Sequence, residues 1–364
     1  KNYLNNKKIK YIFEYQNSVS FKYFIKQILT DYFRIILINF RNIFSDINNV
    51  SYCLPTLRLI KNIHETEIFL QHYRPRVFFG RDDYNASHII KTIILNKYNC
   101  KHVGFHHSAF LHPHISTLLT YTCFNIYYMA GIKYLDELYR DYWFSDTHEI
   151  VGQPYLDYIL SAKNNSKIQD KLAAFFKNEI NILFGIPTIG GTSLFDDISN
   201  IKIKFSKILN IFNKHKNINL IFRCRTYEDT LKLRKIISYD PDTHKNVFLI
   251  TNEFNTYELI SYADIIVGSD TSSLLLEALS LKDKIIIPYN VRFSSKKELL
   301  WYQYNYPYLC DNLIELEETI SKLIAGDLNV SYSNIIERIV DGFSFPRDGK
   351  TWKKVADSVI ECSK

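Results

Sequence analysis

Apolar and polar residues follow two different spacing patterns along this chain. Residues 20–72 place apolar side chains at helical spacing, which predicts helices. From residue 76 onward, short apolar runs alternate with stretches of helical spacing. Strands that alternate with helices form parallel βαβ units, so this larger part of the chain predicts parallel sheets covered by helices.

The elements after residue 76 fall into two halves. In the first half, we predict strands at residues 76–80, 102–106, 123–131 and 149–154, with helices at 88–98 and 134–143. In the second half, we predict strands at residues 181–187, 219–225, 247–251, 264–269 and 284–289, with helices at 201–215, 230–238, 256–263 and 272–281. Short apolar strands with intervening helices are typical of a doubly wound sheet.

A polar stretch, SAKNNSKIQDK (161–171), separates the halves; it begins a helix and is also the best linker candidate. We therefore predict an N-terminal domain over residues 1–160, a C-terminal domain over 161–345 and a closing helix over 346–364. Two Rossmann-like domains that face a central cleft, with a closing helix, form the α/β architecture called GT-B. Its cleft would hold ligands at the carboxyl ends of the strands.

Composition narrows the class of protein. The net charge of +7 suits an anionic partner without selecting one. The six cysteines are scattered and form no CxxC pair, which disfavours a zinc ribbon or a disulfide framework and suits a reducing compartment. No apolar run approaches the roughly 20 residues that span a bilayer, and the segment KNYLNNKKIKYIF lacks the apolar core of a signal peptide. We expect a cytoplasmic protein.

The stretch IIVGSDTSSLLLEAL (265–279) interrupts two apolar runs with four small polar residues. The loop after a strand of a parallel sheet lies at the carboxyl edge, where the next helix exposes free N–H groups. Thr271, Ser272 and Ser273 fit a phosphate site there, and Glu277, one turn further on, is placed to accept from ribose hydroxyls. The alternative is that Asp270 or Thr271 caps the helix, but one residue suffices for a cap.

The segment FRCR (222–225) ends another predicted strand. Side chains alternate along a strand, so Arg223 and Arg225 share one side of it. Two guanidinium groups at a strand end suit a phosphate or a carboxylate. The alternative is a surface pair neutralised by Glu228 and Asp229.

A glycine-containing loop, GIPTIGGT (185–192), follows the first strand of the second half. Glycine lets backbone approach a ligand closely, which makes Gly185 and Thr188 candidate contacts. The loop matches neither GxGxxG nor a phosphate-binding loop with its lysine. An ordinary connecting loop is therefore an equal alternative.

The segment GRDDY (80–84) ends the first strand of the first half. Paired carboxylates beside a cleft suit a general base or a nucleophile, and Arg81 would keep one of Asp82 and Asp83 ionised. The alternative is that Asp83 or Asn85 caps the helix that follows. One carboxylate suffices for a cap, so the second asks for another role.

The segment GFHHS (104–108) ends the next strand, and His112 and His114 follow closely. The spacing matches no HExxH motif and brings no carboxylate cluster, so we predict no metal site and no cofactor. We instead expect one cleft histidine, His106 or His107, to carry a proton or contact a phosphate.

These segments, GRDDY, GFHHS, FRCR and ADIIVGSDTSSLLLEALSLKDKIIIP (263–288), resemble GT-B glycosyltransferases of bacterial surface-polysaccharide synthesis. The likeness is to a loose superfamily of Kdo transferases of capsule and lipopolysaccharide, bacterial sialyltransferases and teichoic-acid glycerophosphotransferases, and it covers residues 75–364. Ser272 and Ser273 resemble the serine pair that holds the CMP phosphate. Sialyltransferases carry a His-Pro pair where this chain has FRCR, which favours a Kdo-type acidic sugar.

The resemblance implies a metal-independent transferase. The C-terminal domain would bind a CMP-linked sugar through Thr271, Ser272, Ser273 and Glu277, while Arg223 and Arg225 neutralise the leaving nucleotide. From the acceptor-side N-terminal domain, Asp82 or Asp83 would act as general base or covalent nucleophile. His106 or His107 would assist proton transfer or phosphate departure. The acceptor would be a surface glycan or a lipid-linked molecule.

Two other functions stay open from the residues. A CDP-polyol phosphotransferase of the teichoic-acid type would use the same fold, and a non-catalytic module would bind a nucleotide or sugar without turnover. Nucleic acid is not an expected partner, because the basic residues are dispersed and no known motif is present. Residues 1–72, basic and aromatic, suit either a peripheral membrane contact or an ordinary helical flank.

Overall fold

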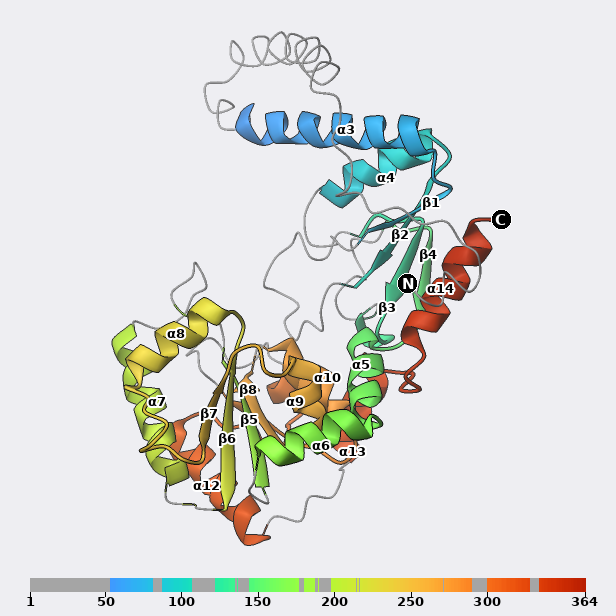
Figure 1. The fold of residues 1–364 in the computed structure, drawn as a ribbon. Helices are drawn as coiled ribbons and strands as arrows, with labels where there is room; N and C mark the ends of the chain where they lie inside the picture. Colours follow the sequence, from blue (N-terminus) through green and yellow to red (C-terminus); the bar gives the residue numbers. More distant parts are fainter. Residues whose placement is uncertain are drawn as a thin grey trace.

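The chain folds around two parallel β-sheets, each flanked by helices, in the computed structural model (Figure 1). In the second sheet, helices cover strands that are apolar and buried along most of their length. The residues that the structure describes are 53–80, 87–106, 122–134, 136, 144–176, 180–186, 189, 198–213, 215, 217–270, 272–289, 300–327 and 334–364.

The first sheet has four strands in the order β1-β2-β3-β4, and every neighbouring pair is parallel. Its strands are β1 (Val77–Gly80), β2 (Lys101–Phe105), β3 (Ile126–Met129) and β4 (Thr147–Ile150). The helices α3 (Cys53–Tyr73) and α4 (Ser87–Lys97) pack at the β1 edge around a small apolar cluster with Phe69, Phe78 and Leu95. Of the helices predicted over residues 20–72, the structure describes α3; the rest lies outside the described residues.

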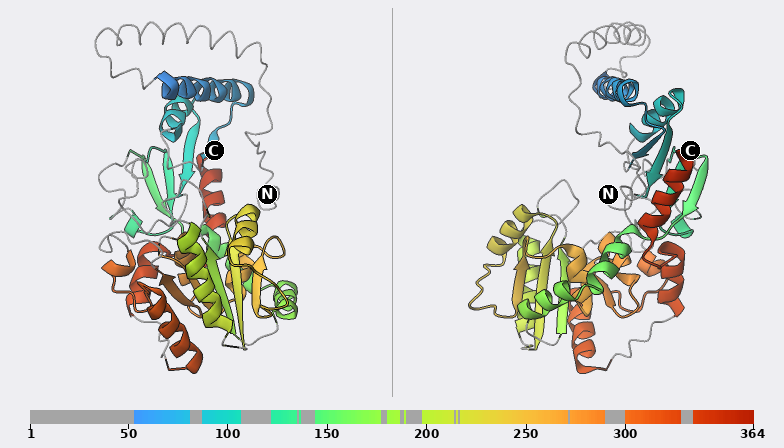
Figure 2. Two further views of the ribbon diagram at one scale, coloured as in Figure 1. Left: turned by 90° about the vertical axis from the view of Figure 1, so that its left-hand side faces the viewer. Right: turned by 45° about the vertical axis from the view of Figure 1, so that its right-hand side comes forward.

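The last helix, α14 (Thr351–Cys362), lies against one face of the first sheet, as both views of Figure 2 show. Val355 packs there with Val103, Tyr128 and Val151. The Tyr128 hydroxyl donates to Ser358 Oγ at 2.9 Å, and the Ser358 hydroxyl donates to a Glu149 carboxylate oxygen at 3.1 Å. The predicted terminal helix is therefore present and completes the first sheet.

The second sheet has five parallel strands in the order β7-β6-β5-β8-β9. Its strands are β5 (Ile180–Ile186), β6 (Ile218–Cys224), β7 (Val247–Ile250), β8 (Ile265–Ser269) and β9 (Ile285–Tyr289). The connecting helices are α7 (Ile198–Asn213), α8 (Tyr227–Ile236), α9 (Thr256–Tyr262) and α10 (Ser273–Leu279). This order is that of the doubly wound sheet predicted from the sequence.

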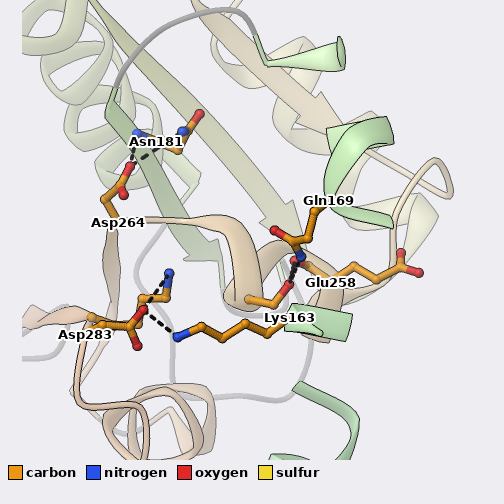
Figure 3. Close-up of polar contacts among 8 residues, drawn as sticks. Lys163, Gln169, Asn181, Glu258, Asp264 and Asp283 are labelled. Carbon is orange, nitrogen blue, oxygen red and sulfur yellow. Dashed lines mark hydrogen bonds and ion pairs between the residues drawn. The ribbon is translucent and has the colours of Figure 1, made fainter. Parts of the chain in front are cut away.

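A row of polar residues joins the amino ends of four strands of the second sheet, as Figure 3 shows in part. Asn219 Nδ2 donates to Asn181 Oδ1 at 2.8 Å, and the Asn181 N–H donates to Asp264 Oδ2 at 2.8 Å. Lys284 continues the row from β9 and lies 3.7 Å from the Asp283 carboxylate. These groups satisfy one another where the apolar strands begin.

The predicted linker, residues 161–171, is helical in the structure. It is divided between α5 (Pro154–Lys163) and α6 (Ser166–Phe175), and Asn165 caps α6 by accepting from the Ile168 N–H at 3.4 Å. Lys163 Nζ lies 2.7 Å from Asp283 Oδ2, and Gln169 Nε2 donates to Ser261 Oγ at 3.0 Å (Figure 3). The segment is polar because its outer face meets solvent, and these contacts bind it to the second sheet.

The chain crosses between the sheets a second time, from α13 (Asn334–Phe343) to α14. A side chain at Gly131, just after β3, would collide with the Gly342 carbonyl oxygen, so the two backbones meet directly. On the other crossing, Asp157 of α5 accepts from the backbone N–H groups of Thr351 and Trp352 at 3.2 and 2.9 Å. Asp157 therefore caps α14, whose own N-cap residue, Lys350, makes no side-chain cap.

The remaining elements are α11 (Leu300–Gln303) and α12 (Leu313–Ala325), which follow β9. The predicted helix at 134–143 lies mostly outside the described residues. The predicted strands at 123–131 and 149–154 are shorter in the structure, as β3 and β4. Among the helices that the structure describes, none is both long and apolar enough to cross a membrane.

Removing the Asp157 carboxylate should loosen α14. We expect Asp157→Ala to lower the free energy of unfolding by about 1–2 kcal/mol, because two helix N–H groups lose their acceptor. The melting temperature of the full chain, measured by calorimetry, tests this. Asp341→Ala is the matched control, since its ion pair with Arg347 is exposed and its loss should cost less than about 0.5 kcal/mol. Equal effects of the two variants would contradict the capping role.

Candidate functional site

The connections of the second sheet separate at the carboxyl ends of β5 and β8. From β5 the chain moves to β6 on one side, whereas β8 and β9 lie on the other side. Loops that leave neighbouring strands in opposite directions open a crevice, and this is where doubly wound sheets bind ligands. The loop after β5 carries GIPTIGGT, and the loop after β8 carries SDTSS.

Two glycines let α10 approach this edge. Gly185 and Gly268 are direct partners across the β5–β8 pair. A Cβ at Gly185 would lie 2.8 Å from Leu274 Cδ2, and one at Gly268 would lie 3.1 Å from Leu275 Cδ2. The space on the Cβ side of Gly185 is therefore filled by a leucine of α10, and a backbone contact of Gly185 with a ligand stays a prediction.

Asp270 is buried directly after β8. Its N–H donates to the Tyr289 carbonyl at 3.0 Å, its carbonyl accepts from Trp301 Nε1 at 2.7 Å, and its Oδ1 accepts from Ser269 Oγ at 3.3 Å. These bonds tie the SDTSS loop to β9 and α11. Asp270 therefore belongs to the framework of the loop and is not the residue that caps α10.

The N-cap residue of α10 is Ser272, and its side chain makes no capping hydrogen bond. The Ser272 N–H donates to the Ser269 carbonyl at 2.8 Å, so the turn is closed by backbone atoms and not by the hydroxyl. Thr271 lies outside the described residues. The alternative that these small polar residues serve as a helix cap thus gains no support from Asp270 or Ser272.

Glu277 is buried in α10, one turn after Ser273, whose hydroxyl hydrogen-bonds its carboxyl group. Burial raises the pKa of Glu277 to about 7, and the bond from Ser273 opposes part of that rise. A carboxyl group with this pKa can accept or donate a hydrogen bond at neutral pH. The structure thus keeps Ser273 and Glu277 together, as the sequence spacing indicated.

Arg223 and Arg225 differ in the structure. Arg223 Nη1 donates to the Thr251 carbonyl, and its Nε donates to Thr256 Oγ1 at 3.3 Å, so this guanidinium joins the end of β7 to the start of α9. Two of the Arg223 donors are thus engaged within the protein, and the contact of Arg223 and Arg225 with a ligand stays a prediction. Arg225, one residue beyond β6, is exposed.

The alternative for Arg223 and Arg225 was a surface pair neutralised by Glu228 and Asp229, but Asp229 does not lie on the surface. It is buried, and its Oδ1 accepts from the Ile189 N–H at 3.0 Å. Its Oδ2 accepts from the Thr226 hydroxyl at 3.0 Å, and Thr226 Oγ1 caps α8 by accepting from the Asp229 N–H at 3.1 Å. A Thr-x-x-Asp spacing at a helix start is a capping signal, but the contact with residue 189 is tertiary and leaves no local sequence signal.

The first sheet contributes fewer described site residues. His106 follows β2, is buried, and its ring lies 4.2 Å from that of Tyr134. His102 lies beneath Gly80 at the end of β1, with Nδ1 2.6 Å from Thr92 Oγ1, and burial, followed by nearby Lys91 and His88, holds its pKa well below the usual value. The remaining candidates lie outside the described residues: Arg81, Asp82, Asp83, His107 and Thr188.

Among the side chains that the structure describes, no three His, Cys, Asp or Glu residues come together in an arrangement that would hold a metal ion. The Cys224 thiol between the two arginines is buried, and burial raises its pKa to about 11. It is therefore protonated at neutral pH and does not act as a nucleophile there.

No protein-family model and no curated protein matches this chain. Several solved structures do match the chain. S. aureus MnaA with UDP has a TM-score of 0.55 and 12% identity, covering 82% of this chain and 79% of MnaA. The wall teichoic acid polymerase TagF with CDPG has a TM-score of 0.54 and 14% identity, covering 83% of this chain and 84% of TagF. A UDP-N-acetylglucosamine 2-epimerase has a TM-score of 0.51 and 12% identity, covering 82% and 76%.

At these identities, the likeness shows the fold alone. It confirms the GT-B architecture of two Rossmann-like sheets predicted from the sequence. Because the match covers most of the chain and most of each neighbour, both sheets take part in it.

Glu277 should make stability depend on pH. Its folded pKa of about 7 exceeds the ordinary 4.5, so folding favours the protonated form. The stabilising contribution is complete below about pH 4.5 and is lost as pH rises through 7. As the pH rises from 4.5 to 8, the free energy of unfolding of Glu277→Gln should therefore increase relative to that of the wild type by up to about 3 kcal/mol, at 1.36 kcal/mol per pKa unit. Melting temperatures of both proteins across this range test it, and a constant difference would contradict the buried carboxyl.

Proposed function

We propose that this chain is a GT-B glycosyltransferase that moves a sugar from a nucleotide-linked donor to an acceptor of a bacterial surface glycan. The observation that carries the proposal is the polar cluster at the β5–β8 crevice. Ser272 has a hydroxyl that is not used as a cap, and Ser273 is paired with the buried Glu277. Such a cluster at the strand ends of a Rossmann-like sheet suits a nucleotide phosphate and ribose.

The donor would lie across the second sheet. Thr271, Ser272 and Ser273 contact the phosphate, and Glu277 accepts from a ribose hydroxyl. Arg225 neutralises the charge that develops on the leaving nucleotide, since it is exposed at the end of β6. Arg223 supports this edge mainly through its bonds to Thr251 and Thr256.

The acceptor would approach from the first sheet. Asp82 or Asp83 takes the proton of the acceptor hydroxyl as its oxygen attacks the sugar carbon, and the bond from that carbon to the nucleotide oxygen breaks with its electron pair. In the retaining alternative, the carboxylate itself attacks first. His106 or His107 assists the departing phosphate. Arg81 keeps the acidic pair ionised.

For the donor, we propose a CMP-linked acidic sugar of the Kdo type, on the sequence resemblance. A second candidate is a CDP-linked polyol phosphate. It is favoured by the likeness to TagF with CDPG across 83% of this chain, and by the engagement of Arg223, which leaves fewer donors for a sugar carboxylate. Residues 1–72 would face a lipid-linked acceptor at the inner side of the membrane.

Nucleotide binding separates these candidates. We expect CMP or CDP, tested with UDP, GDP and ADP and with and without Mg²⁺, to raise the melting temperature of the full chain. A ligand at 100 times its Kd adds about 2.7 kcal/mol. Selective response to CMP supports the CMP-linked donor, response to CDP the polyol phosphate, and response to UDP an enzyme closer to MnaA. Silence for all five nucleotides would overturn the proposal.

Turnover of the donor that responds then separates an enzyme from a binding module. Asp82→Asn and Asp83→Asn should leave nucleotide binding within about threefold, and at least one should lower kcat by 10²-fold or more. Arg225→Ala should weaken nucleotide binding without lowering the melting temperature, whereas Arg223→Ala should lower both. Full turnover in all four variants would sink the site assignment.

A further inference from the structure

We propose that Asp229 is a positioning residue that holds the nucleotide-binding loops after β5 and β6 in one fixed arrangement. The inference rests on the proposed function, because it concerns how that site is held. Asp229 itself would not contact the substrate. It would instead hold residues next to the proposed donor contacts in place.

The two oxygens of Asp229 serve two different loops. Oδ1 accepts from the Ile189 N–H at 3.0 Å, in the loop after β5. Oδ2 accepts from the Thr226 hydroxyl at 3.0 Å, in the turn after β6. Thr188 precedes Ile189, and Arg225 precedes Thr226 in the sequence. A single carboxylate thus bonds to the residue that follows a proposed ligand contact, once after β5 and once after β6.

Lys232, one turn further along α8, bonds to the carbonyl group of Ile189. Its Nζ donates to the Ile189 carbonyl oxygen at 3.0 Å, while the Ile189 side chain is buried. Both backbone polar groups of Ile189 are therefore bound by α8. A residue whose N–H and carbonyl are both bonded loses little further freedom when a ligand binds nearby, so less of the binding free energy is spent on ordering it.

This arrangement differs from ordinary helix capping. Capping α8 needs only the Thr226 hydroxyl, which accepts from the Asp229 N–H. The carboxylate of Asp229 is not required for that bond, yet it is buried, and it joins the Ile189 N–H to the hydroxyl of the N-cap residue Thr226. Burying a charged group is unfavourable unless it is well bonded, which makes this carboxylate a sensitive point of the edge.

The test compares nucleotide affinity with stability in the full chain. Asp229→Ala should raise the Kd for CMP or CDP at least tenfold, and Lys232→Met should raise it about three- to tenfold. Asp229→Asn should stay within about threefold of the wild type, because its amide oxygen can still accept from Ile189. Asn165→Ala is the matched control: it removes the cap of α6, a helix that packs with α5 and α9, and should lower the melting temperature with an unchanged Kd.

Hydrogen exchange of the peptide spanning residues 185–192 provides a second readout, and Asp229→Ala should accelerate it while Asn165→Ala should not. A wild-type Kd in Asp229→Ala, with a lowered melting temperature, would overturn the inference and leave the proposed function standing. If Asp229→Ala does not fold, an unchanged Kd in Lys232→Met overturns it instead. Silence of the wild type toward every nucleotide would overturn both.

Discussion

The central place of β5 in the second sheet is the constraint on which the candidate site depends. Because β5 bonds to β6 on one side and to β8 on the other, the loops after β5 and β8 must part at its carboxyl end. Gly185 and Gly268 face each other at this point, and α10 comes close to the sheet there. The positions of Ser272, Ser273 and Glu277 all follow from that close approach.

The sequence predicts the framework of this fold well, because the strands are short, continuously apolar and separated by helices of regular spacing. Eight of the nine strands of the described part fall within predicted strands or within one residue of them, and β4 begins two residues before its predicted strand. The helix predicted to begin within residues 161–171 is present, as the end of α5 and the start of α6. Its tertiary contacts, such as that of Lys163 with Asp283 just before β9, could not be predicted. A contact between residues far apart in the chain has no local pattern.

The same limit applies to the candidate site. Spacing along a helix correctly places Ser273 beside Glu277, because both belong to one element. Period-2 alternation along β6 cannot show that Thr251 and Thr256 accept from Arg223. Likewise, nothing near Asp229 in the sequence indicates that its carboxylate accepts from the Ile189 N–H. Residue type and position are readable, whereas the partners of long polar side chains are decided by tertiary structure.

The packing of α14 on the first sheet also affects when this sheet can finish folding during synthesis. Val103, Tyr128 and Val151 precede residue 152, but Val355 of α14 packs on them. During synthesis these apolar side chains therefore lack this cover until α14 has left the ribosome, although domains generally begin folding from the N-terminus. The first sheet is thus translated about 200 residues before the helix that completes its core.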